Sequence, residues 1–380
     1  MKIAFAGGGT GGHFYPIIAV AEKVNQLIDR ENIIGVKLYY FSNDPFDREL
    51  LFENRLIYAE IMAGKIRTHP GLRGVLSNFL DIFKTLFGMV NAIFKMFSIY
   101  PDVVFGKGGF ASFPAIFAAR LFGIPVLIHE SDSAPGRVNK WAGRFAKRVA
   151  VSWKDAAEYF PKEKVAWTGH PTRMEIEQAA ERDEALKYFK LEKDLPTILV
   201  LGGSQGAELI NNTVLDCLPR LVKKYQVIHQ TGIRNFKIVS GQADVILGKE
   251  ENKIRYVPMA YLNSLELKMA AGAAKIIVSR AGSTLFEIAS WGIPSILIPF
   301  AHSNADHAKK NAFNYAHAGA CAVIEEANMT GNILASEIDR ILAESGNWQK
   351  MAAAAKAFHK PGAAEKIARV LIDMALEHEK

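Results

Sequence analysis

Short apolar runs alternate with longer segments of helical periodicity along most of the chain. In the first half, apolar runs at 3–6, 36–41, 103–105 and 126–128 predict strands, with amphipathic segments between them. Continuous apolar runs are typical of parallel strands buried on both faces, and their alternation with helices is typical of βαβ units. The first half is therefore predicted to form a doubly wound α/β domain.

The second half repeats this pattern, with predicted strands at 198–201, 226–229, 275–279 and 295–298. Between the halves, an apolar run ends in Gly169-His170-Pro171, and we place the domain boundary at this glycine and proline break. Near the end, Pro361-Gly362 separates an alanine-rich helix from a last predicted helix over 363–379. The pattern alone leaves open whether that helix packs on the first domain.

A wide apolar stripe at helical spacing lies between residues 75 and 97. Its members are Phe79, Ile82, Phe83, Leu86, Phe87, Val90, Ile93, Phe94 and Phe97. Lys84 and Lys95 interrupt the stripe, and Arg67 and Arg73 precede it. Two interpretations stay open. The stripe is either one face of a core helix, or a basic-flanked face that rests on an anionic membrane without spanning it. Uninterrupted apolar runs fall short of the roughly 20 residues that a spanning helix needs.

Composition narrows the class of protein only slightly. The chain has 380 residues, of which 49% are hydrophobic, and this suits two domains with separate cores. Cys217 and Cys321 show neither metal-ligand spacing nor a pairing pattern, which favours a reduced, cytoplasmic setting. The net charge of +7 favours polyanionic partners without choosing among them. The chain begins directly with a strand, so we expect no signal peptide.

Two glycine-rich loops follow predicted strands and open predicted helices. The first is Gly7-Gly8-Gly9-Thr10-Gly11-Gly12-His13, and the second is Gly202-Gly203-Ser204-Gln205-Gly206-Ala207. Such loops let backbone N–H groups approach an anion at the positive end of the helix dipole. Two of them predict two nucleotide-binding domains that hold a phosphate-bearing ligand between them.

His13 stands in the first turn of the helix after the first loop. An imidazole with its ordinary pKa near 6.5 is suited to act as a general base there, although a role limited to capping or anion contact is the alternative. Gly106-Lys107-Gly108-Gly109 follows the strand at 103–105, so it is predicted beside the first loop. Gly7-x-Gly9-x-x-Gly12 also matches the dinucleotide fingerprint, which keeps an NAD-dependent oxidoreductase open.

Further polar groups follow other predicted strands. His129-Glu130-Ser131-Asp132 is expected to face the ligand cleft, and Arg173 at the domain junction suits a phosphate. Ser283 and Thr284 open a helix that carries Glu287, whose carboxylate is able to accept two ribose hydroxyls.

Taken in order, these motifs resemble the MurG family of glycosyltransferases, which add N-acetylglucosamine to the undecaprenyl-linked peptidoglycan precursor. The resemblance covers nearly the whole chain. It implies a GT-B fold, with two Rossmann-like parallel-sheet domains separated by a cleft. Because the family's C-terminal helix returns to the first domain, we expect domains at 1–171 with 358–380 and at 172–357.

The resemblance implies a role for each matching residue. His13 is the catalytic base. The acceptor diphosphate site comprises Gly9, Gly12, His13, Gly106, Gly108 and Gly109. Donor UDP-GlcNAc binding falls to Thr10, Gly11, Gly12, Asp132, Arg173, Ser204, Gln205, Met259, Ala260, Ser283, Thr284, Glu287 and His307. Within that set, Glu287 holds the uridine ribose, and the backbone of Met259 and Ala260 meets the uracil. The membrane patch comprises Phe79, Ile82, Phe83, Leu86 and Phe87.

The resemblance also implies the partners. We expect transfer from UDP-GlcNAc to the C4 hydroxyl of a lipid-linked muramyl acceptor (lipid I to lipid II) at the cytoplasmic face of the cell membrane. We expect an anionic inner-membrane surface as partner, no nucleic acid, no cofactor and no metal. No Asp-x-Asp pair precedes a nucleotide site.

Four departures from the family pattern stand out. Ser131 and Asp132 replace the Gln-Asn of a Glu-Gln-Asn motif, and His170 replaces an asparagine. The stretch 280–287 is one residue short. Ala308 replaces a glutamine that reads the donor sugar, with Asp306 or His307 as candidate substitutes. A different donor sugar, a UDP-sugar epimerase and a non-catalytic nucleotide-sugar sensor therefore stay open as alternatives.

Overall fold

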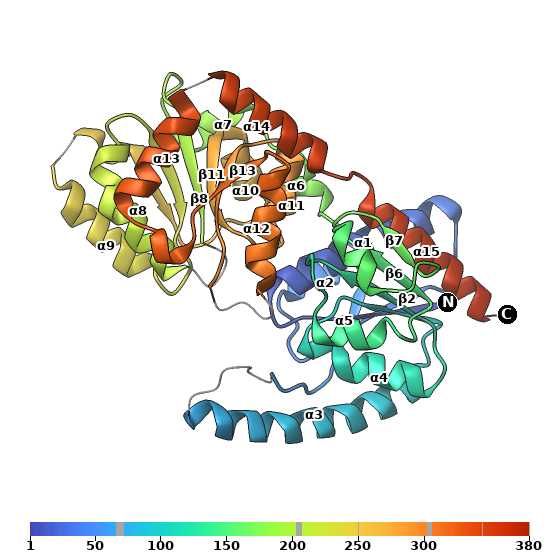
Figure 1. Ribbon diagram of the computed structural model, residues 1–380. Helices are drawn as coiled ribbons and strands as arrows, with labels where there is room; N and C mark the ends of the chain where they lie inside the picture. Colours follow the sequence, from blue (N-terminus) through green and yellow to red (C-terminus); the bar gives the residue numbers. More distant parts are fainter. Residues whose placement is uncertain (66–71, 203–206, 250, 302–305, 344, 380) are drawn as a thin grey trace. The chain divides into compact units, whose positions relative to one another are not determined.

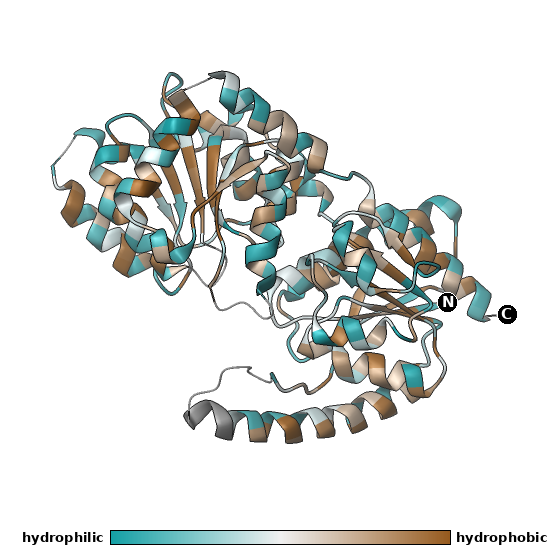
Figure 2. Cartoon of the chain, in the orientation of Figure 1, coloured by the Kyte–Doolittle hydropathy of each residue, from teal (hydrophilic) through white to brown (hydrophobic). Residues whose placement is uncertain are grey.

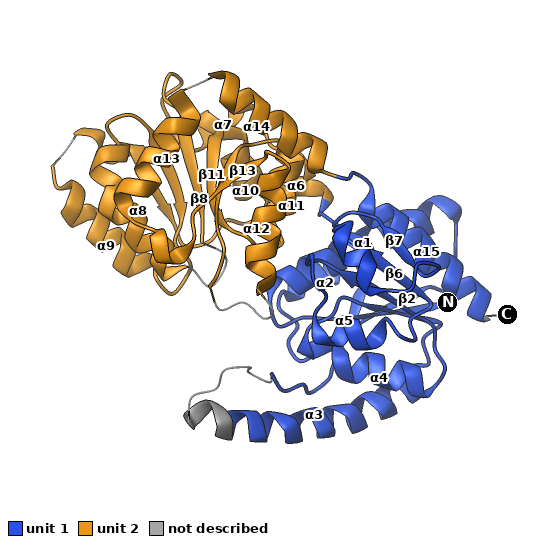
Figure 3. Cartoon of the chain, viewed as in Figure 1, with its two compact units in different colours: residues 1–173, 360–380 blue, residues 174–359 orange. Residues whose placement is uncertain are grey.

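The computed structural model describes residues 1–380 except 66–71, 203–206, 250, 302–305, 344 and 380. The chain divides into two compact units, shown in Figure 3. Unit 1 comprises 1–173 with 360–380, and unit 2 comprises 174–359. Each junction lies two residues beyond the predicted position, so Arg173 belongs to unit 1 rather than to the second domain.

Unit 1 is built on a seven-stranded, fully parallel sheet with the order β3-β2-β1-β4-β5-β6-β7. The strands are β1 (Lys2–Ala6), β2 (Lys37–Ser42), β3 (Leu56–Glu60), β4 (Val103–Gly106), β5 (Val126–Glu130), β6 (Arg148–Val151) and β7 (Val165–Trp167). Strand order reverses between β1 and β4. Ligands of open α/β sheets bind at such a switch point, at the carboxyl ends of the strands.

Helices cover this sheet (Figure 1). They are α1 (Gly11–Glu31), α2 (Arg48–Glu53), α3 (Leu72–Ile99), α4 (Phe113–Leu121), α5 (Arg137–Ala142) and α15 (Ala363–Glu379), with 3-10 turns at Phe110–Ser112 and Asp155–Tyr159. The last helix, α15, lies against α1 and contributes Ile367, Leu371 and Ala375 to the unit 1 core. The C-terminal helix therefore returns to the first unit, as the family resemblance implied.

Unit 2 repeats this architecture with six parallel strands in the order β10-β9-β8-β11-β12-β13. They are β8 (Thr197–Leu201), β9 (Gln226–Gln230), β10 (Tyr256–Met259), β11 (Ala274–Arg280), β12 (Ser295–Ile298) and β13 (Cys321–Val323). Its switch point lies between β8 and β11. The predicted class, two Rossmann-like parallel-sheet units in one chain, is confirmed.

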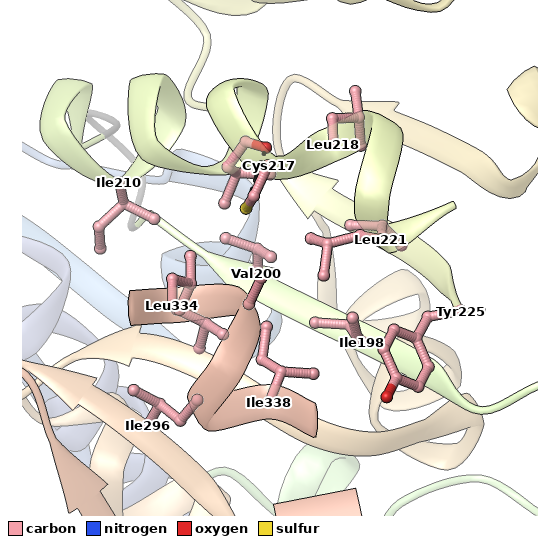
Figure 4. Packing of buried hydrophobic residues seen from close by; sticks show 14 of the residues in the cluster. Ile198, Val200, Ile210, Cys217, Leu218, Leu221, Tyr225, Ile296, Leu334 and Ile338 are labelled. Carbon is pink, nitrogen blue, oxygen red and sulfur yellow. Dashed lines mark hydrogen bonds between the residues drawn. The ribbon is translucent and has the colours of Figure 1, made fainter. Parts of the chain in front are cut away.

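The helices of unit 2 are α6 (Met174–Glu177), α7 (Arg182–Tyr188), α8 (Glu208–Leu221), α9 (Phe236–Leu247), α10 (Ser264–Ala273), α11 (Thr284–Trp291), α12 (His307–His317), α13 (Gly331–Ala343) and α14 (Ser345–Phe358), with 3-10 turns at Glu251–Arg255 and Glu326–Asn328. One face of the sheet packs against α8 and α13: Ile198 and Val200 meet Leu218 and Ile338 in an apolar core (Figure 4). Cys217 and Cys321 are buried free thiols.

Candidate functional site

Two glycine loops meet at the switch point of unit 1. One follows β1 and the other follows β4, and these strands are direct neighbours. Gly109 in the second loop has a φ of +75°, which favours glycine. A Cβ atom at Gly109 would lie 3.1 Å from Nε2 of His13. The backbone of one predicted phosphate loop therefore lies directly against the imidazole of the other.

The N-terminus of α1 is open for an anion. Thr10 occupies the N-cap position, but its side chain makes no cap hydrogen bond, and the first turn contains no acidic residue. Among the described residues, the N–H groups of Gly11 and Gly12 have no hydrogen-bond partner. Because a 21-residue helix turns its positive dipole end toward this point, a phosphate group fits there.

His13 is oriented by Thr10. The Oγ1 atom of Thr10 lies 2.9 Å from Nδ1 of His13. When Nδ1–H donates to Thr10, Nε2 carries the lone pair, and Nε2 is the nitrogen that faces Gly109. The half-buried ring is thus held at the anion site with one nitrogen able to accept a proton.

The expectation that His129 and Glu130 face a ligand is wrong. Both side chains are buried at the end of β5. The Glu130 carboxylate accepts hydrogen bonds from the backbone N–H groups of Asp132 (2.9 Å) and Gly136 (3.0 Å) and from Nδ2 of Asn139 (2.9 Å). These bonds shape the loop after β5. The hydrogen bonds favour the ionised carboxylate, but burial has the larger effect and raises the pKa of Glu130.

A buried polar network runs beneath the loop after β4. Nζ of Lys107 donates to Oγ of Ser131 at 2.6 Å, and that oxygen lies 3.3 Å from Nδ1 of His170. Oγ of Ser152 then joins His170 to His129, at 3.1 Å from each ring. Burial lowers the pKa of Lys107, and burial together with the Lys107 charge lowers the pKa values of His129 and His170 well below the ordinary range.

Sequence reasoning missed this role of Lys107. The available signal was a lysine among glycines in a loop otherwise suited to bare backbone contacts. Ser131 and His170, both departures from the family pattern, contact each other in this network. Asn139 also lies below the loop, because a Cβ at Gly108 would come within 2.7 Å of its Nδ2 atom. The network therefore supports the loop after β4, the predicted acceptor loop, from inside unit 1.

Two predicted donor residues of unit 1 lie at the same end of the sheet. The guanidinium carbon of Arg173 stands 4.1 Å from the centre of the Tyr15 ring on α1, and only 7% of Arg173 is exposed. Asp132 is half-buried in the loop after β5. Thr10 is the N-cap residue of α1, and Gly11 and Gly12 begin it, so part of the predicted donor set lies in unit 1.

The remaining donor residues belong to unit 2. Ser204 and Gln205 lie outside the described residues. At the neighbouring strand β11, Ser283 precedes α11 without a side-chain cap bond, and Thr284 begins the helix. Glu287 is half-buried in the first turn of α11. These polar groups stand at the switch point of the second sheet, where the predicted nucleotide site requires them.

The predicted uracil contact lies at the end of β10. The carbonyl of Met259 accepts two hydrogen bonds from Thr231, from its N–H at 2.9 Å and from its Oγ1 at 3.2 Å. Among the described residues, neither the N–H nor the C=O of Ala260 has a partner. Of Met259 and Ala260, it is therefore Ala260 whose backbone N–H and C=O are available to a nucleobase. His307 begins α12 and Ala308 follows it, both half-buried.

The predicted membrane patch is an exposed face of α3. Phe79, Ile82, Phe83, Leu86 and Phe87 are all at least 45% exposed. The buried side of this helix instead contains Asp81, Gly88, Ala92 and Met96. The core-helix interpretation of the stripe is therefore wrong, because its aromatic residues are exposed. Figure 1 shows α3 running alongside α4, and Figure 2 shows that many residues of α3 are hydrophobic.

The inner side of α3 is closely fitted to unit 1. A side chain at Gly88 would overlap the carbonyl of Met62, and the N–H of Gly64 donates to Oγ1 of Thr85 at 3.1 Å. By length and composition alone, the described stretch Ser77–Ile99 is also long and apolar enough to cross a membrane. Within the described part of the chain, no group of three or more His, Cys, Asp or Glu side chains is arranged to hold a metal ion.

Comparison with known proteins agrees with this architecture. Residues 3–151 match the Glycosyltransferase family 28 N-terminal domain, and residues 197–367 match the corresponding C-terminal domain. Together with the two repeated sheets, these matches define the class as a two-domain, GT-B glycosyltransferase. Within that class, the chain belongs to the MurG family, the UDP-N-acetylglucosamine–N-acetylmuramyl-(pentapeptide) pyrophosphoryl-undecaprenol N-acetylglucosamine transferases.

A member of this family from Pediococcus pentosaceus is 34% identical over 374 residues, covering 98% of this chain and 99% of the relative. Among solved structures, Acinetobacter baumannii MurG has a TM-score of 0.72 at 24% identity, covering 98% of this chain and 99% of that one. A UDP-GlcNAc 2-epimerase from Neisseria meningitidis bound to UDP-GlcNAc has a TM-score of 0.66 at 16% identity, covering 98% and 100%. The two structural likenesses show a shared fold.

Proposed function

We propose that this protein transfers N-acetylglucosamine from UDP-GlcNAc to the C4 hydroxyl of an undecaprenyl-diphosphate-linked N-acetylmuramoyl-peptide, with inversion of configuration. This step belongs to peptidoglycan synthesis. One observation carries the proposal: in a member of the MurG family, His13 is fixed at an open helix N-terminus and against the second glycine loop. A base and an anion site are thereby brought together.

The acceptor binds at unit 1. Its diphosphate occupies the N-terminus of α1 and the loop containing Gly108 and Gly109, where N–H groups and the helix dipole offset its charge. Nε2 of His13 then removes the proton of the C4 hydroxyl as that oxygen attacks the anomeric carbon of the donor. The bond from that carbon to the diphosphate oxygen breaks on the opposite face, so a single displacement inverts the configuration.

The donor is bound chiefly by unit 2. Glu287 accepts the ribose hydroxyls, Ala260 contacts the uracil through its backbone, and the helix start at Ser283 and Thr284 faces the diphosphate. His307 contacts the hydroxyl groups of the donor sugar, because the side chain of Ala308 has no polar group to do so. Arg173 and the helix N-termini stabilise the negative charge of the departing UDP. Transfer takes place only when donor and acceptor are both bound.

Because helix N-termini and a guanidinium supply this charge, the proposal includes no metal. Removal of divalent cations with EDTA should therefore leave the transfer rate within about twofold of the untreated enzyme. A loss of activity that Mg²⁺ or Mn²⁺ restores would contradict this part of the proposal.

The exposed apolar face of α3 supports a location on a membrane surface. Helices that lie in the interface bury an apolar face between headgroups and acyl chains. The buried small-residue side of α3 stays packed on unit 1, which favours this arrangement over a spanning one. Lys84 on the same helix is 64% exposed, with its Nζ 3.8 Å from Oδ1 of Asp81, and adds a cation that anionic headgroups attract. We therefore place the enzyme peripherally at the cytoplasmic face, where a lipid-linked acceptor is presented.

A transfer assay with UDP-GlcNAc, UDP-GalNAc and UDP-glucose tests the proposed donor, using a soluble lipid-linked muramyl analogue as acceptor. Selective use of UDP-GlcNAc supports the proposal and shows that groups other than a glutamine at position 308 read the sugar. Preference for another sugar would retain the fold and mechanism but overturn the proposed donor. UDP binding without transfer from any donor would favour a nucleotide-sugar sensor.

A further inference from the structure

A buried chain of hydrogen bonds in unit 2 links α8 to the ends of β9 and β10. The Tyr256 hydroxyl lies 2.9 Å from Nδ1 of His229, and Nε2 of His229 lies 3.0 Å from Oδ1 of Asn211. Nδ2 of Asn211 donates to the Thr231 carbonyl at 2.9 Å. All four residues are at least nine-tenths buried. No role in the reaction described above requires any of them directly.

Only one arrangement of protons satisfies this network. Because the Thr231 carbonyl is an acceptor, the Asn211 amide must turn its NH₂ toward Thr231 and its oxygen toward His229. Nε2 of His229 must then carry the proton, and Nδ1 accepts the hydrogen bond of the Tyr256 hydroxyl. Burial lowers the pKa of His229 to about 3, so the ring remains neutral in ordinary buffers. A fully satisfied buried network is rigid.

The network ends at the proposed base contact. Thr231, held through its carbonyl by Asn211, directs its own N–H and hydroxyl to the carbonyl of Met259. Met259 is thereby fixed, and the next residue, Ala260, leaves its N–H and C=O without partners among the described residues. Asn211, which makes this bond to Thr231, lies in the first turns of α8, directly after the predicted donor phosphate loop. The same side chains therefore connect the phosphate-binding helix and the base-contacting segment.

We propose that Asn211, His229 and Tyr256 are positioning residues that hold the Ala260 backbone for selective binding of uridine over cytidine nucleotides. This inference rests on the proposed function, in which Ala260 contacts the uracil. Uracil presents an N3–H donor beside a carbonyl acceptor, so it pairs with a fixed C=O and N–H. Cytosine presents the reverse, an acceptor at N3 and an amino donor, so like groups would face each other. Such discrimination is lost when the backbone pair moves.

Two substitutions at His229 separate positioning from packing. His229→Gln retains an amide NH₂ for Asn211 and a carbonyl oxygen for Tyr256, whereas His229→Leu retains only apolar volume. Tyr256→Phe removes one hydroxyl and keeps the ring. Tyr225→Phe is the matched control, because it removes another tyrosine hydroxyl bond in the same unit, 2.7 Å from Asp339, outside the network.

Dissociation constants for UDP and CDP are measured by calorimetry, and kcat and KM are measured with the UDP donor. His229→Leu should reduce the ratio of UDP to CDP affinity by about tenfold, the equivalent of one lost hydrogen bond. Tyr256→Phe should reduce it by about threefold, with kcat at saturating donor near wild type for both. His229→Gln and Tyr225→Phe should keep the wild-type ratio.

Three outcomes overturn the inference. An unchanged ratio in His229→Leu and Tyr256→Phe shows that the network does not position the base contact. Equal losses of UDP and CDP affinity show a role in general stability alone. A His229→Gln variant as defective as His229→Leu shows that hydrogen bonding is not the cause. If His229→Leu does not fold, Tyr256→Phe and His229→Gln decide. Wild-type protein that does not bind UDP would instead overturn the proposed function itself.

Discussion

The outward face of α3 offers a quantitative prediction about membrane binding. Phe87 and Phe94 are 67% and 70% exposed. With about 200 Å² per phenylalanine, these two side chains present roughly 270 Å² of apolar surface. At about 25 cal/mol per Å², complete transfer of this surface into lipid would contribute about 7 kcal/mol. If the helix lies in the interface with half of the area in contact with acyl chains, the contribution is about 3.5 kcal/mol.

Phe87→Asp/Phe94→Asp should therefore weaken binding to anionic phospholipid vesicles by a few hundredfold, since 1.4 kcal/mol corresponds to tenfold. Neither side chain is buried, so the free energy of unfolding should change by less than about 0.5 kcal/mol. Transfer to a soluble acceptor analogue should stay near wild type. Vesicle sedimentation over a range of lipid concentrations measures the loss directly.

The matched control is Ile34→Asp/Phe52→Asp. These residues of unit 1 are 90% and 86% exposed and lie outside α3, so the control removes a comparable apolar surface and adds the same charge. It should bind vesicles within about threefold of wild type. Equal binding by the α3 variant and the wild type would refute the membrane role of α3. Equal losses in both variants would show a general effect of charge.

Three further predictions concern single residues. His13→Ala should lower kcat by about 10²–10⁴-fold without preventing UDP binding, and near-wild-type turnover would remove His13 from the mechanism. Glu287→Ala should weaken UDP affinity by about tenfold in calorimetry, while 2′-deoxy-UDP should bind wild type and variant more alike; unchanged UDP affinity would exclude the ribose contact. His229 has a folded-state pKa of about 3 against an ordinary 6.5, so the unfolded chain takes up its proton first as the pH falls. The stability that depends on neutral His229 is therefore present above pH 6.5 and decreases below it. Between pH 6.5 and 5.0, wild type should lose about 1.5 kcal/mol more than His229→Gln in urea denaturation, and identical losses would contradict the low pKa.

The hydrophobic pattern was sufficient to predict the class of fold and most interior strands. The pattern did not predict β3, β10 and β13, and these three strands lie at sheet edges. These strands are short or only partly apolar, and β10 contains Pro258, which only an edge or an irregular position tolerates. Edge strands bury less surface, so their sequences are less constrained to continuous apolar runs.

The orientation of side chains was harder to predict than their position along the chain. The stripe in α3 predicted a helix, but small residues such as Gly88 and Ala92 give the close approach to unit 1, and the aromatic residues face outward. His129 and Glu130 end a strand at the edge where ligands bind. Their partners come from 132–139 and from Ser152 and Gly169, just after β6 and β7, and meet them only after folding. The pairing of Thr10 with His13 was accessible from their spacing at a helix start. Lys107 stood out among glycines, but its partner Ser131 could not be predicted from the sequence.

The most direct test of the central claim is the acceptor dependence of sugar transfer. Purified enzyme is incubated with UDP-GlcNAc carrying a labelled sugar, with and without the lipid-linked muramyl analogue, and all labelled products are separated. We expect a β-linked disaccharide only when the acceptor is present, with one UDP released for each disaccharide. Conversion of UDP-GlcNAc to an epimeric sugar without acceptor, or a disaccharide with retained configuration, would contradict it.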